Sequence, residues 1–251
     1  MERIDFLGFL YTIYCMRLDV ALVSQNIYPT RARAAAAIHG GLVTVNGVVA
    51  TKPSQAVSDT DVLAGGELPY SVGRGSLKLE RALDVFGVNP AGGVCLDIGA
   101  STGGFTSVLL ARGAVRVIAV DVGTNQLVAE LKNDVRVLSL EQTDIRTLHP
   151  VQPVDLVVID VSFISLADIV PVLRAWGARD VIALIKPQFE VPRNVAARSA
   201  GIIKLHQWHE YAINRATDAF RDAGFVRAGL TESPIHGGSG NVEFLAHFVA
   251  A

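Results

Sequence analysis

The 251-residue sequence has few of the features that mark secreted, metal-binding or membrane-spanning proteins. Its two cysteines, Cys15 and Cys95, form neither a disulfide framework nor a metal-ligand spacing, and this scarcity is typical of a reducing cytoplasm. No uninterrupted apolar run approaches the ~18–20 residues that a transmembrane helix needs. Glu2 and Asp5 interrupt the apolar start of the chain, unlike a secretory signal. The sequence therefore predicts a cytoplasmic protein with no membrane segment and no metal ion.

Charge is scarce as well. Charged residues make up 18% of the chain and the formal net charge is −2, so the composition does not by itself indicate a nucleic-acid partner. The front segment differs, because residues 16–56 contain one acid, Asp19, against the cations Arg17, Arg31, Arg33 and Lys52. This local excess predicts a polyanionic partner near the N-terminus.

Residues 16–68 have the pattern of a small α+β domain. A short apolar helix face around residues 18–22 precedes an alanine-rich helix, with Thr30 as its expected N-cap and Gly40–Gly41 as its expected end. Asn46–Gly47 then lies between two valine-rich runs, which is the strongest local signal of a β-hairpin.

The remaining segments differ from this domain in pattern. Residues 1–15 are expected to form an extension outside the fold, and the Gly- and Pro-rich residues 69–77 a linker. From residue 78 to residue 251, apolar strand runs alternate with helical stretches, which is typical of a parallel sheet covered on both faces. The last two runs are joined only by a short turn, so they must be antiparallel. The expected fold class is a Rossmann-like α/β sheet with a terminal antiparallel hairpin, preceded by the small α+β domain.

The stretch CLDIGASTGGFT contains a glycine-rich loop after the first of these strands. Nicotinamide-binding loops have the pattern G-x-G-x-x-G, and phosphate-binding P-loops have G-x-x-x-x-G-K-[ST]. This loop lacks the middle glycine of the first pattern, and Phe105 stands where the second has lysine. A ligand without a phosphate chain is therefore favoured. The candidate binding residues of the loop are Gly99, Ala100, Ser101, Gly103 and Gly104.

Three acids follow or end three successive strands of the predicted sheet: Asp97, Asp121 and Asp144. A lone aspartate in a loop usually caps a turn or a helix, but ligands bind at the edge of an α/β sheet where these three lie. Asp97 could accept from an amino group, Asp121 from two ribose hydroxyls and Asp144 from an adenine edge. S-adenosylmethionine has these groups and no phosphate, and it is favoured over a nicotinamide cofactor.

Several motifs in order resemble those of a known family. MRLDVALVSQNIYPTRARAAAAIHGGLVTVNG resembles the S-four RNA-binding domain. GRGSLKLERAL, CLDIGASTGGFT, IDVSFISL, IKPQFE and GNVEFL resemble the TlyA family of ribosomal RNA 2′-O-methyltransferases, which are sometimes named haemolysins. The resemblance runs from Met16 to the C-terminus and implies a class I, FtsJ-like methyltransferase domain that uses S-adenosylmethionine. It also implies a catalytic tetrad of Lys78, Asp160, Lys186 and Glu243.

The chemistry of a ribose 2′-hydroxyl fits such a tetrad. The hydroxyl is a weak acid, and a lysine can take its proton only if the pKa of that lysine falls well below ~10.4, through burial or a second cation. We predict that Lys186 is the proton acceptor with Asp160 as its nearest partner, while Lys78 and Glu243 position the ribose and the amine. Each residue alone has a simpler interpretation: Lys78 as a surface charge, Lys186 as a strand end, and Glu243 as an edge-strand residue that deters aggregation.

The resemblance also implies a target and partners. Cytidine in large-subunit ribosomal RNA is the implied target, small-subunit RNA stays open, and ribosomal RNA or ribosomal subunits are the expected partners. The RNA-binding candidates are Arg17, Arg31, Arg33 and Lys52. The chain departs from the family pattern at Gly73, where serine is usual, and at Lys204, which replaces an arginine, so the substrate loop can differ in detail. The rival hypotheses are a non-catalytic RNA-binding or ribosome-assembly factor and a haemolysin-like membrane activity; the oligomeric state does not follow from the sequence.

Overall fold

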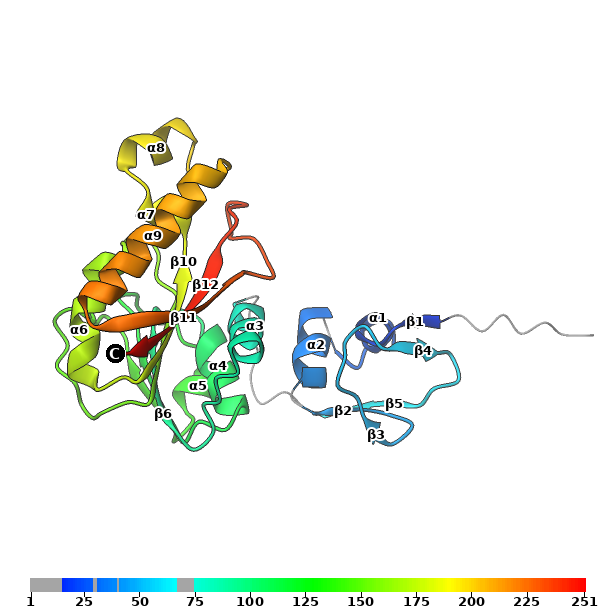
Figure 1. The fold of residues 1–251 in the computed structure, drawn as a ribbon. Coiled ribbons are helices and arrows are strands. Elements are labelled where there is room, and N and C mark those ends of the chain that lie inside the picture. The colour runs from blue at the N-terminus through cyan, green and yellow to red at the C-terminus, as the bar shows by residue number, and fades with distance from the viewer. Residues whose placement is uncertain (1–14, 29–30, 40, 67–74) are drawn as a thin grey trace, which may run out of the picture. The chain divides into compact units, whose positions relative to one another are not determined.

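The computed structural model describes residues 15–28, 31–39, 41–66 and 75–251, and the chain divides into two compact units, residues 1–68 and 69–251 (Figure 1). The predicted N-cap Thr30 lies outside the described residues, as do most of the predicted extension over residues 1–15 and of the predicted linker over residues 69–77. At the inner ends of these two segments, Cys15 already belongs to a strand and Ser76 to a helix.

The small unit combines two helices with short antiparallel sheets. Its elements are β1 (Cys15–Arg17), α1 (Leu18–Ser24), α2 (Arg31–His39), β2 (Val43–Val45), β3 (Val48–Val49), β4 (Ala56–Ser58) and β5 (Leu63–Gly65). β1 pairs with β4, and β2 lies between β3 and β5. Asn46 (φ 52°) and Gly47 (φ 80°) are both left-handed, as a two-residue hairpin turn requires, so the predicted hairpin is confirmed. Apolar side chains of both helices, including Leu18, Leu22 and Ile38, fill the core of this unit.

The large unit alternates strands and helices. Its elements are α3 (Ser76–Phe86), β6 (Val94–Ile98), α4 (Gly104–Ala111), β7 (Arg116–Val120), α5 (Ala129–Lys132), β8 (Val137–Leu140), β9 (Leu156–Ile159), the 3-10 turn η1 (Leu166–Asp168), α6 (Val170–Leu173), the 3-10 turn η2 (Arg174–Trp176), β10 (Asp180–Ile185), α7 (Pro187–Glu190), α8 (Arg193–Arg198), α9 (His206–Asp222), β11 (Phe225–Glu232) and β12 (Phe244–Ala250). The alternation of strands and helices that was predicted for residues 78–251 is therefore confirmed.

One seven-stranded sheet organises this unit in the order β11-β12-β10-β9-β6-β7-β8. The strands from β10 to β8 pair in parallel, which confirms the predicted parallel sheet. β12 pairs antiparallel with both β11 and β10, so the predicted antiparallel hairpin is also confirmed. The sequence did not reveal that β12 lies between β10 and β11, because that pairing joins segments far apart in the chain.

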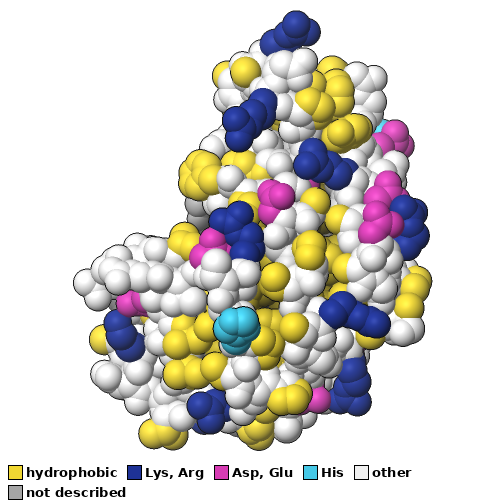
Figure 2. Space-filling view, turned by 90° about the vertical axis from the view of Figure 1, so that its left-hand side faces the viewer, with side chains coloured by type: hydrophobic (Ala, Val, Ile, Leu, Met, Phe, Trp, Pro, Cys, Tyr) yellow, Lys and Arg dark blue, Asp and Glu magenta, His cyan; other side chains and the backbone are white. Residues whose placement is uncertain are grey.

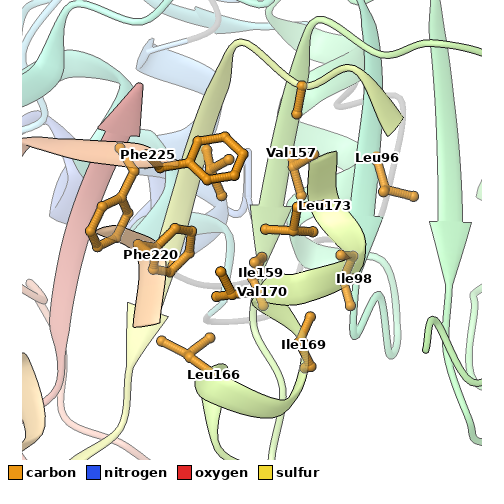
Figure 3. Close-up of a cluster of buried hydrophobic side chains, with 14 of the residues drawn as sticks. Leu96, Ile98, Val157, Ile159, Leu166, Ile169, Val170, Leu173, Phe220 and Phe225 are labelled. Atoms are coloured by element: carbon orange, nitrogen blue, oxygen red, sulfur yellow. The ribbon is translucent and has the colours of Figure 1, made fainter. Parts of the chain in front are cut away.

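Apolar side chains cover both faces of the sheet. On one face, side chains of β6 and β9 such as Ile98 and Ile159 pack against Val170 and Leu173 of α6 and against residues around Phe220 at the end of α9 (Figure 3). On the other face, α3 and α4 pack over the neighbouring strand residues in a second buried cluster. The inner strands β6, β7, β9, β10 and β12 thus alternate between two cores, which fixes the positions of their ends.

The topology brings the residues that follow the strands to one edge. Because β6, β7, β9 and β10 are parallel, the loops that begin at Gly99, Asp121, Asp160 and Lys186 leave the sheet on the same side. β12 runs in the opposite direction and its first residue, Phe244, pairs with Ile185, so the start of β12 reaches this edge too. The predicted site residues of the large unit therefore come from the ends of six strands, because Asp144 follows β8, and from α3, which carries Lys78.

Candidate active site

The loop after β6 folds tightly back against the edge of the sheet. Gly99 (φ 85°), Ser101 (φ 48°) and Gly103 (φ 98°) are left-handed, and α4 begins at Gly104. A Cβ atom on Gly99 would lie against the carbonyl oxygen of Asp160, and one on Gly103 would lie against the side chain of Leu131. Glycine is therefore required at both positions by backbone conformation and by close packing.

A cavity of about 860 Å³ lies beside this loop. Gly99 and Ser101 line it from the loop, and Asp121, Asp144 and Asp160 line it from the ends of the neighbouring strands. Asp121 accepts the backbone N–H of Ser101 at 2.8 Å on one carboxylate oxygen and that of Gly123 at 2.7 Å on the other. Each oxygen of Asp121 receives one donor in this way and keeps a lone pair for a second.

Asp144 lines the larger cavity and forms an ion pair with Arg146. Its carboxylate accepts the guanidinium of Arg146 at 2.6 Å and the backbone N–H of Arg146 at 2.9 Å. These bonds hold the pKa of Asp144 below its usual value, so Asp144 is an anion at neutral pH. Its predicted role toward an adenine edge stays a prediction.

Asp97 differs from the other two acids. It is fully buried and borders neither of the two cavities at this edge. The hydroxyl of Thr106 donates to one of its oxygens at 2.6 Å, while the other oxygen has no hydrogen-bond partner. Burial raises the pKa of Asp97 to about 7, against the lowering effect of Thr106. The structure thus places Asp97 behind the loop, not in the cavity wall, and contact with a ligand stays a prediction.

A second cavity of about 340 Å³ adjoins the first and shares Gly99, Ser101, Asp160 and Ser162 with it. Lys186, which follows β10, lies 2.6 Å from Asp160 and donates to the Ser162 hydroxyl at 2.9 Å. Asp160, which follows β9, lines both cavities. The Lys186–Asp160 ion pair therefore stands where the two cavities meet.

Lys78 lines the second cavity from α3 and forms an ion pair with Glu243, at 2.6 Å between Nζ and Oε2. The Glu243 side chain is only 2% exposed and the Lys78 side chain 10%. The interpretation of Lys78 as a surface charge is therefore wrong. The interpretation of Glu243 as an edge-strand residue is also wrong, because β12 is paired on both sides. The predicted tetrad is thus brought together as two ion pairs, with Glu243 behind Lys78.

Two residues near the ion pairs were not predicted from the sequence. Phe163 lines the larger cavity with its side chain 91% exposed and its backbone left-handed (φ 68°), and its ring centroid lies 5.3 Å from that of Phe189. Glu190 is buried at the end of α7, where it accepts the Ser165 hydroxyl at 2.6 Å and the Leu166 N–H at 2.8 Å. Burial raises the pKa of Glu190. Both residues lie inside motifs that resemble the family. Neither was predicted, because the exposure of Phe163 and the burial of Glu190 depend on the tertiary structure.

The small unit is less basic at its surface than the sequence count indicates. Arg17 and Arg31 both bind the carboxylate of Asp19, at 2.9 Å and 2.8 Å. Arg33 is half-buried in α2, and Lys52 is exposed. Lys52 is therefore the candidate whose charge is most available to a phosphate.

Two negative findings hold for the described part of the chain. No group of three or more His, Cys, Asp or Glu side chains there is arranged to hold a metal ion. In the same residues, no helix has the length and apolar character that crossing a membrane would require.

The chain is similar to known proteins over nearly its whole length. The FtsJ-like methyltransferase family model matches residues 71–249 and the S4 domain model matches residues 16–63. A Mycobacterium tuberculosis protein named 16S/23S rRNA (cytidine-2′-O)-methyltransferase TlyA is 43% identical over 236 residues, which cover 91% of this chain and 87% of that protein. Hemolysin A of Brachyspira hyodysenteriae is 40% identical over 245 residues, which cover 93% of this chain and 100% of that protein.

A solved structure has the same architecture. It is of a Streptococcus thermophilus protein described as a hemolysin, with a TM-score of 0.69 and 43% identity, and the match covers 94% of this chain and 89% of that one. The resemblance that the motifs indicated is confirmed. The chain belongs to the FtsJ-like methyltransferase family and carries an S4 domain ahead of its methyltransferase domain.

Proposed function

We propose that this protein transfers a methyl group from S-adenosylmethionine to the 2′-hydroxyl of a ribose, that of a cytidine in ribosomal RNA. The observation that carries the proposal is the Lys186–Asp160 ion pair, which stands where a large cavity beside the glycine loop meets a smaller one lined by Lys78. The names of the similar proteins supply the nucleotide and the RNA class.

The larger cavity suits S-adenosylmethionine. The cofactor brings two ribose hydroxyls and amino groups, all donors, and Asp121 has two lone pairs free for donors at the cavity wall. Ile98, Val120 and Ile145 add apolar surface next to Asp144. We propose that Asp121, Asp144 and the loop over residues 99–104 hold the cofactor, with Asp97 supporting the loop from behind. When bound, the cofactor supplies a methyl group on a sulfonium sulfur.

Residues of this chain accept the proton of the ribose hydroxyl and position the group that accepts it. Lys186 first releases a proton of its ammonium group to solvent, and the neutral amine then takes the proton of the ribose hydroxyl as that oxygen becomes a nucleophile. Asp160 and the Ser162 hydroxyl fix the position of the Lys186 amine, at 2.6 Å and 2.9 Å. Lys78, held by Glu243, presents a cation to the same cavity and can stabilise the charge that develops on the oxygen. Alignment of hydroxyl and methyl carbon supplies much of the rate.

Phe163 is suited to receive the base of the target nucleotide. An apolar ring that is almost fully exposed gains from stacking, and stacking of a base on an aromatic side chain contributes ~1–3 kcal/mol. Phe189 supports the ring from one side. The left-handed backbone of Phe163 is strained for a bulky residue, which is typical of functional sites.

The small unit is proposed to bind the RNA. We propose domain boundaries of 16–68 for this S4-like unit, 69–77 for the linker and 78–251 for the methyltransferase domain. Arg17, Arg31, Arg33 and Lys52 are the proposed phosphate contacts, which position RNA without reading its sequence. Ribosomal RNA as substrate would put the enzyme in the cytoplasm, in agreement with its two cysteines.

The test is transfer of a tritiated methyl group from S-adenosylmethionine to purified large and small ribosomal subunits and to naked ribosomal RNA. The wild type is compared with Lys186→Arg, which keeps a cation beside Asp160 but cannot release its proton, and with Lys132→Ala, which changes an exposed lysine distant in sequence. We expect label on a ribose with the wild type and Lys132→Ala and none with Lys186→Arg.

Two outcomes would contradict the proposal. Absence of label on every RNA with the wild type would favour a non-catalytic RNA-binding factor, and leakage of liposomes on addition of the purified protein would favour the haemolysin hypothesis. Full activity of Lys186→Arg would remove Lys186 as the proton acceptor.

A further inference from the structure

One segment of the large unit carries cations and no acid. Residues 191–209 contain no Asp or Glu, although acids make up 24 of the 251 residues of the chain. Three exposed cations lie in this segment, Arg193, Arg198 and Lys204, and we call them the α8 rim. They form no ion pair in the part of the chain that the structure describes, whereas six other arginines of the unit pair with an acid: Arg112, Arg136, Arg146, Arg179, Arg215 and Arg221.

The α8 rim borders the proposed active site. Pro192, Arg193 and Ala196 line the same cavity as Asp160 and Phe163. In Figure 1, α8 and the start of α9 extend beyond the sheet, and Figure 2 shows several Lys and Arg side chains at that end of the molecule, with apolar surface and an acidic side chain among them. Because Phe163 is the residue proposed to stack on the target base, the rim and the proposed base-stacking residue border the same cavity.

The segment is also held in place by buried contacts. Asn241, which is buried in the loop before β12, donates to the carbonyl oxygen of Gly201 at 2.7 Å and accepts the N–H of Ile203 at 2.8 Å. On the other side, Arg215 donates to the carbonyl oxygen of Glu190 at 3.0 Å. The cations therefore extend from an ordered backbone, and a ligand that binds them has less conformational entropy to remove.

We propose that the α8 rim is a second RNA contact, which binds the phosphates of nucleotides next to the one that enters the cavity. The inference rests on the proposed function, since that function supplies the RNA. Unpaired, exposed cations suit phosphates, because no resident acid competes for them and binding releases the counterions of the RNA. RNA is favoured over an acidic protein or an anionic membrane because Arg193 of the rim lines the same cavity as Phe163, the residue proposed to stack on the target base.

The test measures affinity for naked ribosomal RNA as a function of salt, in the absence of cofactor, so that it does not depend on methyl transfer. The variant is Arg198→Ala with Lys204→Ala, two positions outside the lining of either cavity. Arg116→Ala is the matched control, because Arg116 is an exposed cation at the start of β7, the opposite edge of the sheet, and has no ion pair with any residue that the structure describes. Loss of two phosphate contacts should lower the slope of log K against log salt by about 1.4.

A slope reduced in the double variant and unchanged in Arg116→Ala supports the proposal, even if the wild type then transfers no methyl group and the proposed function fails. A double variant with the slope of the wild type overturns it. Binding to vesicles of anionic lipid that the double variant loses, with RNA binding retained, overturns it in favour of a membrane surface. Affinity for S-adenosylhomocysteine, which reports on the intact large unit, accompanies each variant.

Discussion

The four residues of the tetrad form two ion pairs, Lys78–Glu243 and Lys186–Asp160. The Lys78–Glu243 pair is the more deeply buried of the two. Removing one partner of a buried ion pair leaves an uncompensated charge and commonly costs about 3 kcal/mol or more of stability. We therefore expect Glu243→Gln to lower both the free energy of unfolding and methyl transfer. Denaturant unfolding and the initial rate of transfer measure the two effects.

A double variant separates the two roles of this pair. Lys78→Met with Glu243→Leu replaces the charges by apolar groups of similar size, which restores stability in other buried pairs. If the pair has a catalytic role, the double variant recovers its free energy of unfolding but not its rate. Recovery of the rate as well would mean that the pair is only structural.

The raised pKa of Asp97 makes the stability of the fold depend on pH. Burial raises its pKa to about 7 in the folded protein, while the unfolded value is ~3.9. Between these two values the folded state holds a proton that the unfolded state has released, so stability must fall as pH rises from about 4 to about 7, by at most ~1.4 kcal/mol per pH unit. Asp97→Asn should flatten this part of the curve, measured by denaturant unfolding at several pH values.

The control for this prediction is Asp144→Asn. The pKa of Asp144 lies below its usual value, so it titrates outside this window and the variant should keep the slope between pH 5 and pH 7 of the wild type. An equal slope in the wild type and Asp97→Asn would show that Asp97 is ionised in the fold.

At the scale of elements, the loop between β6 and α4 depends on glycine for two separable reasons. Gly99→Ala would strain a left-handed residue, which costs about 1–2 kcal/mol, and would also push against the backbone of Asp160. Gly92→Ala is the matched control, since Gly92 is left-handed (φ 74°) with open space around it. We expect Gly99→Ala to lose more thermal stability than Gly92→Ala and to lose methyl transfer. Equal losses of stability in both variants would mean that the close approach has no effect.

Some features of the fold and the site were predictable from the sequence, and others were not. The hairpin at Asn46–Gly47 was predictable because its signal is local backbone chemistry. The two ends of the tetrad were predictable from motifs, yet the pairing of Lys78 with Glu243 was not, because 165 residues separate them in sequence. The insertion of β12 beside β10, the buried position of Asp97 and the exposure of Phe163 likewise depend on packing between distant segments.

At the scale of the whole molecule, the net charge does not describe the charges near either proposed RNA contact. Acids line the larger cavity of the large unit beside the cations of the α8 rim, and the cations proposed to contact RNA in the small unit include two that share Asp19. A formal net charge of −2 therefore hides the distribution that matters for an RNA ligand. Affinity for RNA should follow the cations that lack an acidic partner, not the total charge.

Lys52 and Arg17 test this distinction in the full-length protein. Lys52→Ala removes an exposed cation and should lower the slope of log K for RNA against log salt by about 0.7, the value for one phosphate contact. Arg17→Ala changes the net charge equally, but Arg17 is bound to Asp19 and its field is already compensated, so its effect on the slope should be smaller. If the two variants lower the slope equally, net charge controls RNA binding and the local arrangement around Asp19 does not. If only Lys52→Ala lowers it, the small unit binds phosphate through Lys52, and the acid in α1 limits the part that Arg17 takes.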